Sequence, residues 1–142
     1  MKIWRSVGFL AIAAMAVAQS DSKLYPGARL DRAGTQEAMT ANHQPDVEVT
    51  VYTTADPFDK VCAHLKKTGK EFKAIGSRAR KLPNGQELKD TFFILDSAAS
   101  PADSKHWVKV QRPYLGQYGL VRNGGGQEQI RDITALVVTK KK

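Results

Sequence analysis

Alternation of apolar and polar side chains predicts the strands of this chain. Residues 47–53 place a valine at every second position with polar residues between them, which is the period of a half-buried strand. Four further strands are predicted later in the chain, over residues 73–82, 87–96, 107–111 and 130–139. The turn Pro83-Asn84-Gly85 joins the first two of these as a hairpin, because Asn and Gly both tolerate positive φ. The three lysines at 140–142 are expected to form a solvated tail.

A helix with one apolar face is predicted between the first strand and the others. The residues that repeat at helical spacing, and are therefore expected to be buried, are Phe58, Val61, Cys62 and Leu65. Asp56 is expected to cap the free N–H groups of this helix, and Pro57 to occupy its first position. Gly69 is expected to end it, after two lysines that suit a helix C-terminus.

The order strand, helix and four strands predicts an α+β fold. We expect one main helix packed across one face of an antiparallel sheet of four or five strands. This element order resembles the cystatin-like α+β layout, without the Gln-x-Val-x-Gly inhibitory loop of that family. Residues 46–140 are expected to form a single domain, and residues 19–45 an irregular lead-in. A short helix capped by Thr35 is predicted within residues 31–44 of the lead-in.

The N-terminus has the pattern of an export signal. Lys2 and Arg5 precede an apolar stretch over residues 7–18, which is shorter than the roughly 20 apolar residues that a membrane span needs. Ala16-Val17-Ala18 matches the small-x-small site that signal peptidase accepts. We therefore expect residues 1–18 to be a signal peptide that is cleaved after Ala18, and the mature protein to be periplasmic or secreted. A buried N-terminal helix is the alternative.

Two short segments resemble a set of uncharacterised small exported bacterial proteins. In these proteins a Tyr/Pro-Pro-Gly-Ala segment precedes a strand and a helix that opens with Thr-x-Asp-Pro-Phe. The corresponding segments of this chain are residues 25–28 and 54–58. The resemblance implies export and a shared fold, and it transfers no activity and no functional residues.

The positive charge of the mature chain is concentrated in one segment. The whole sequence carries a formal net charge of +8, which falls to +6 without residues 1–18. Residues 59–81 alone carry +6, and the other charged side chains of the mature chain cancel. Clustered cations attract polyanions, so the candidate polyanion-binding residues are Lys66, Lys67, Lys70, Lys73, Arg78, Arg80 and Lys81. The alternative is that these cations solubilise a helix face and protect an edge strand from mispairing.

No residue pattern in the sequence indicates a catalytic, metal or cofactor site. His43, His64 and His106 lie 21 and 42 residues apart, which fits no metal-ligand motif. Cys62 lies on the predicted apolar helix face, where a buried thiol is expected to be inert. The glycines at 124–126 are not followed by the Gly-Lys-Ser/Thr of a phosphate loop. We expect no enzyme activity, no metal and no cofactor.

The sequence therefore favours an exported binding or interaction module of unknown ligand. An anionic envelope polymer or lipid is the partner that the charge favours. Nucleic acid is disfavoured, because the chain is expected to be exported and its basic segment lacks interleaved aromatic residues. The long loop over residues 114–129, which carries Tyr114 and Tyr118, is a second candidate ligand site. The alternative function is a small envelope enzyme whose active site the sequence does not identify.

Overall fold

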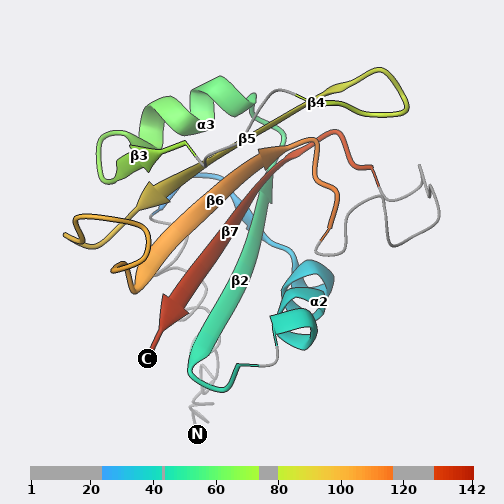
Figure 1. Cartoon of the computed structure of the whole chain (residues 1–142). Helices are drawn as coiled ribbons and strands as arrows, with labels where there is room; N and C mark the ends of the chain where they lie inside the picture. The colour runs from blue at the N-terminus through green and yellow to red at the C-terminus, as the bar shows by residue number, and fades with distance from the viewer. Residues whose placement is uncertain (1–23, 43, 74–79, 117–129) are drawn as a thin grey trace, which may run out of the picture.

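The computed structural model describes residues 24–42, 44–73, 80–116 and 130–142 of the chain (Figure 1). The predicted signal peptide lies outside these residues, as do Arg78 and most of the predicted loop at 114–129. No helix among the described residues is long and apolar enough to cross a membrane.

The described residues form a seven-stranded antiparallel sheet with two helices (Figure 1). Its strands are β1 (Arg29–Leu30), β2 (Val47–Thr54), β3 (Lys70–Phe72), β4 (Arg80–Lys81), β5 (Glu87–Ile94), β6 (His106–Arg112) and β7 (Thr134–Lys141). Along the sheet they lie in the order β1-β2-β7-β6-β5-β3, and β4 pairs with β5. The first long strand, β2, therefore lies beside the last one, β7, from the Val47–Lys141 pair to the Thr54–Thr134 pair.

The α+β class and the antiparallel sheet are confirmed, whereas the predicted four or five strands are too few. The additional strands β1 and β3 have two and three residues, too few to produce a periodic pattern in the sequence. Of the strand predicted over residues 73–82, β4 is present, Lys73 is not in a strand, and residues 74–79 lie outside the described part of the chain. The predicted tail also differs, because β7 continues to Lys141 and pairs there with β2. The Asn84-Gly85 hairpin is confirmed: Gly85 has a φ of 85° and the Leu82 N–H donates to the Gln86 carbonyl at 2.7 Å.

Helix α3 (Phe58–Leu65) covers one face of the sheet, which we call the α3 face. The predicted apolar stripe is confirmed, since Val61, Cys62 and Leu65 are buried and Phe58 packs against the same cluster. The sheet residues that meet this stripe include Phe93, Val108, Val110, Leu136 and Val138. Because β2 and β3 lie at opposite sides of the sheet, α3 crosses this face to join them.

The predicted start of α3 is wrong in its details. Pro57 is the N-cap residue, and the helix has no side-chain cap. The Asp56 carboxylate instead accepts a hydrogen bond of 2.5 Å from the Tyr25 hydroxyl and lies 3.6 Å from the Lys60 ammonium. Tyr25 belongs to the buried cluster under α3 and is only 4% exposed. A residue of the predicted irregular lead-in is thus part of the core.

The end of α3 also differs from the prediction. The helix stops at Leu65, four residues before Gly69. Gly69 does not adopt the left-handed conformation of a helix-terminating glycine, because its φ is not positive. A Cβ at this position would lie 3.0 Å from the Ile94 carbonyl oxygen. Glycine is therefore favoured at 69 because a side chain would crowd the backbone of β5.

Helix α2 (Arg32–Asn42) lies along the edge of β2 and over the opposite face, which we call the α2 face. The short helix predicted in this region is confirmed, but Thr35 is not its cap. The Gly34 N–H donates to Asp31 Oδ1 at 3.0 Å, so Asp31 supplies the capping carboxylate. Thr35 Oγ1 instead accepts a hydrogen bond of 2.9 Å from the Val51 N–H on β2.

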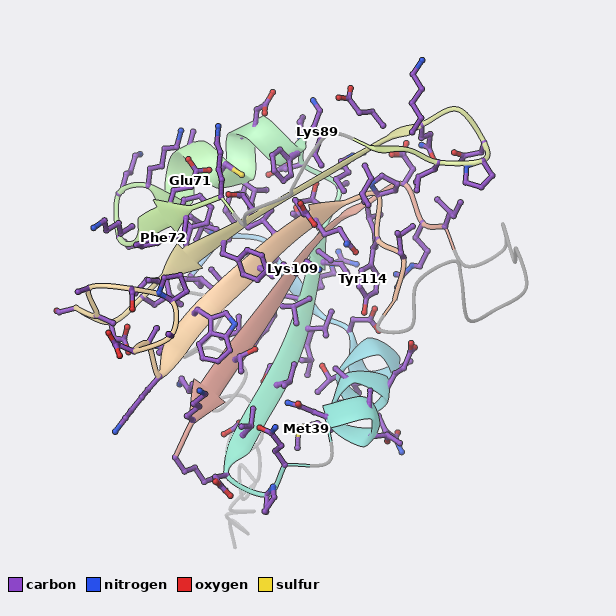
Figure 2. The ribbon with its side chains drawn as sticks, in the orientation of Figure 1. Met39, Glu71, Phe72, Lys89, Lys109 and Tyr114 are labelled. Atoms are coloured by element: carbon purple, nitrogen blue, oxygen red, sulfur yellow. The ribbon has the colours of Figure 1, made fainter. Side chains whose placement is uncertain are left out.

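The same helix protects the free edge of β2. Met39, one turn after Thr35, places its sulfur 3.3 Å from the Val49 N–H (Figure 2). Ala38 is fully buried against the β2 valines that point to the α2 face. Two N–H groups that β1 is too short to reach therefore find partners on α2, which prevents pairing with another chain at this edge.

Candidate functional site

Helix α2 covers only part of its face of the sheet. Its apolar contacts on that face come from β2 and β7, including Val51, Ala135 and Val137. Cross-strand partners in an antiparallel sheet point to the same face, and the register pairs Val137 with Lys109, and Lys109 with Phe92. The side chain of Lys109 therefore lies on the α2 face, over the strands that α2 leaves uncovered (Figure 2). The register places Phe92 on the same face.

The register brings three aromatic rings and three lysines together on this uncovered area. Phe92 is paired with Phe72 of β3, and the neighbouring row contains Lys70, Ile94 and Trp107. Lys141 of β7 follows on the same face, because it lies two residues beyond Thr139, the partner of Trp107. We call this surface the open face, and it consists of Lys70, Phe72, Phe92, Trp107, Lys109 and Lys141.

Each lysine of the open face lies over one of the rings. The ammonium nitrogen is 5.2 Å from the ring centroid for Lys70 and Phe72, 5.8 Å for Lys109 and Phe92, and 5.4 Å for Lys141 and Trp107. These distances are within the range of a cation–π contact, which contributes about 0.5–1 kcal/mol at an exposed site. The contacts fix the three positive charges above the sheet.

The charges of the open face are available to a ligand. Lys70 and Lys141 are exposed, and Lys109 and the three rings are half-buried. Among the described residues, none of these three lysines forms an ion pair with a carboxylate. Asp90, two residues before Phe92, is a carboxylate on the same side of β5, so cations remain in excess. The open face can thus attract an anion and offer it apolar ring surface.

The structure distributes the predicted polyanion residues over several surfaces. Of the predicted residues that the structure describes, Lys70 lies on the open face. Lys66 is 3.8 Å from the Glu71 carboxylate on the α3 face, and Lys73 lines the cleft beside it. Lys67 lines a groove with Tyr25 and His64. Lys66, Lys67 and Lys70 also meet at one hollow between the end of α3 and the end of β5. Arg80 and Lys81 lie on β4, and Arg78 is outside the described residues.

Sequence reasoning missed five of the six residues of the open face. The alternation in 107–111 places Trp107 and Lys109 on one side of a strand, but it does not show which strands lie next to it. Phe72 joins this surface through its pairing with Phe92 of β5, and Lys141 joins it because β7 lies beside β6; both neighbours are distant in sequence. The hydrophobic pattern shows which residues share one side of a strand. It does not show how that strand is aligned with its neighbours in the sheet.

Apart from the open face, a hollow with a volume of about 570 Å³ lies between α3 and β5. Both positively and negatively charged side chains line it, as Glu71 and Lys89 show in Figure 2. The lining residues include Cys62, Lys66, Glu71, Glu87, Lys89 and Thr91. Glu71 accepts a hydrogen bond of 3.1 Å from the Thr91 hydroxyl. Burial, and then the nearby Glu71 and Asp59 carboxylates, raises the pKa of Cys62 to about 12. The thiol therefore stays protonated at neutral pH and is not an activated nucleophile.

The two described histidines lie in different elements, His64 in α3 and His106 in β6. His43 is outside the described residues, and His64 packs edge-on against Tyr25 with ring centroids 5.3 Å apart. His106 begins β6. In the part of the chain that the structure describes, no three His, Cys, Asp or Glu side chains are arranged to hold a metal ion.

Tyr114, a candidate from the predicted ligand loop, points into the protein. It is 4% exposed, packs with the α2 cluster and lies under the Arg131 guanidinium at 5.8 Å. Burial, with the nearby Glu37 and Asp31 carboxylates, raises its pKa to about 12. Tyr114 therefore anchors the start of the loop, while Tyr118 lies outside the described residues.

Comparison of the chain with protein-family models, with curated proteins and with solved structures finds no match.

Proposed function

We propose that this protein is an exported, non-catalytic binding module that holds an anionic ligand on its open face. The observation that supports the proposal is the set of three lysine–ring pairs on an area of the sheet that no described helix covers. The expected signal peptide makes an envelope component or another extracellular anion the relevant ligand.

The open face suits this task better than the basic segment 59–81 as a whole. Lys66 in that segment is already paired with Glu71, and Lys60 with Asp56. The three lysines of the open face instead have aromatic partners, which orient the ammonium groups without neutralising them. A ligand anion can therefore bind these lysines without first breaking an ion pair.

The test compares two neighbouring lysines on one strand. Lys141 lies over Trp107 on the open face, whereas Lys140 points to the other side of β7, opposite Glu48 and His106. Both are exposed, so Lys141→Met and Lys140→Met remove the same charge from adjacent positions. Binding to dextran sulfate is measured by calorimetry at low and at physiological salt.

We expect Lys141→Met to weaken binding about five- to tenfold at low salt, since one ion contact at the surface contributes about 1 kcal/mol. Lys140→Met should change the affinity less than twofold. The combined Lys70→Met and Lys141→Met variant should lose most binding and show a shallower salt dependence. Equal effects of the two single substitutions would mean that only net charge matters, and the proposal would then be wrong.

A further inference from the structure

The chemistry of the open face points to one class of ligand. We propose that it binds a linear acidic polysaccharide, whose sugar rings pack on the aromatic side chains while its acidic groups meet the lysines. This inference rests on the anion-binding function proposed above and adds the class of ligand to it.

The position of α2 argues against a membrane surface as the ligand. Helix α2 rests on β2 valines that point to the same face as Phe92 and Trp107. Helix α2 flanks the open face along β2, where Ala38 packs on the sheet and Thr35 reaches the strand edge (Figure 1). A planar bilayer would have to accommodate α2 beside the lysine–ring pairs. A narrow polymer can lie on the sheet beside the helix.

The arrangement of the rings fits an extended ligand. Phe72 and Phe92 are partners on adjacent strands, and Trp107 lies one strand further and two residues along. Strands are about 4.8 Å apart and rise about 3.3 Å per residue, so the three rings form a diagonal of roughly 12 Å across the sheet. Several repeating units, each with an anionic group, can occupy this line at once. A single small anion would reach one lysine.

The lysine–ring contacts favour acidic sugars over nucleic acid. An ammonium group lies above the face of each ring at 5.2–5.8 Å. A nucleobase would have to displace this group to stack on the ring. A carboxylate can instead bind the outer side of the ammonium while the apolar C–H groups of its sugar contact the lysine stem and the part of the ring beside the ammonium. The acidic sugar thereby keeps all three cation–π contacts.

The experiment compares three anionic probes that are matched in number of charges: an oligogalacturonate, an oligoglutamate peptide and an oligothymidylate. Their affinities for the full mature chain are measured by calorimetry at physiological salt. We expect the oligogalacturonate to bind at least about tenfold more tightly than the peptide, because the peptide has charges but no rings to pack. A tenfold difference corresponds to about 1.4 kcal/mol.

Two aromatic variants separate ring contacts from charge. Trp107→Leu and Phe92→Leu should each weaken oligogalacturonate binding about five- to tenfold and leave the weak binding of the peptide unchanged. Phe58→Leu is the matched control, because Phe58 is a half-buried ring on the α3 side of the sheet. Circular dichroism verifies that each variant is folded, and two ring positions are used so that one unfolded variant does not end the test.

The possible failures are distinguishable. If oligogalacturonate and oligoglutamate bind equally and lose affinity only with Lys141→Met, the face binds anions but the polysaccharide inference is wrong. If oligothymidylate binds most tightly and depends on Trp107, the ligand class is single-stranded nucleic acid instead. If no probe responds to Lys141→Met, the proposed function itself is refuted.

Discussion

Arg112 is predicted to be a main determinant of stability at the end of the sheet where three segments meet. One guanidinium nitrogen donates to the carbonyls of Ala55 and Asp56, at 3.3 and 3.0 Å, and to the Thr134 hydroxyl at 3.0 Å. The other donates to the Asp132 carbonyl at 3.2 Å and lies 3.3 Å from its carboxylate. Arg112 therefore joins β6 to the β2–α3 connection and to the start of β7.

The expected cost of Arg112→Met follows from these contacts. A hydrogen bond that involves a charged group contributes about 1.5–3 kcal/mol, but the contributions of one side chain do not add fully. The Arg112 side chain is 24% exposed, so water can replace part of the lost bonding, and the methionine retains the packing of the stem. We expect a loss of about 3 kcal/mol in the free energy of unfolding, or about 10 °C in Tm for a domain of this size.

Chemical denaturation with urea, followed by circular dichroism, measures this loss. Asp132→Asn is the matched control, because it removes the ion pair but leaves the carbonyl contacts. The Asp132 side chain is 69% exposed, so its loss should cost less than about 1 kcal/mol. If Arg112→Met is no more destabilising than Asp132→Asn, the backbone contacts of the guanidinium do not contribute as argued.

Three further predictions concern the α3 face. Leu65→Ala should lower the free energy of unfolding by about 3–4 kcal/mol in urea denaturation, because Leu65 is fully buried at the centre of the core cluster; a loss below about 1 kcal/mol would contradict that packing. Cys62 should react with a thiol reagent at neutral pH much more slowly than an exposed cysteine, since burial raises its pKa to about 12 and leaves almost no thiolate; rapid labelling of the native protein would contradict this protection. Tyr25→Phe should lower stability and flatten its pH dependence at both extremes. Burial and the hydrogen bond to Asp56 raise the pKa of Tyr25 from 10.0 to about 12, so its contribution is complete below pH 10 and is lost as the pH rises through 12. That hydrogen bond also lowers the pKa of Asp56 below 3.8, so this contribution is present above that pH and is lost in acid. Wild-type and variant stability curves that stay parallel from acid to alkali would refute the linkage.

Local structure was predictable from the sequence where one signal was strong and short in range. The valine alternation identified β2, and the spacing of Val61, Cys62 and Leu65 identified the buried side of α3. The Asn84-Gly85 hairpin followed from the conformational preference of two residues. These features depend on neighbours within one or two turns of the chain, so the sequence contains the necessary information.

The cap predictions failed because tertiary contacts competed for the same side chains. Asp56 could cap α3, but its carboxylate binds the hydroxyl of Tyr25, which is 31 residues away. Thr35 could cap a helix, but its hydroxyl accepts the N–H of Val51 at the edge of β2. A polar side chain in a folded protein forms a hydrogen bond with a buried donor or acceptor that has no other partner. A local sequence pattern does not show which distant group that is.

The sequence by itself determined the α+β class, the amphipathic helix and the excess of positive charge. It also contains the pattern from which we infer export. The tertiary structure decided where the charge is presented: it keeps Lys66 and Lys67 near Lys70 at the end of α3, and it places Lys70 on one face with Lys109 and Lys141. The physical reason is strand register. The alternation of residues along a strand determines only which of its own side chains lie on the same side. Pairing between strands that are distant in sequence determines which rings and lysines share a face of the sheet.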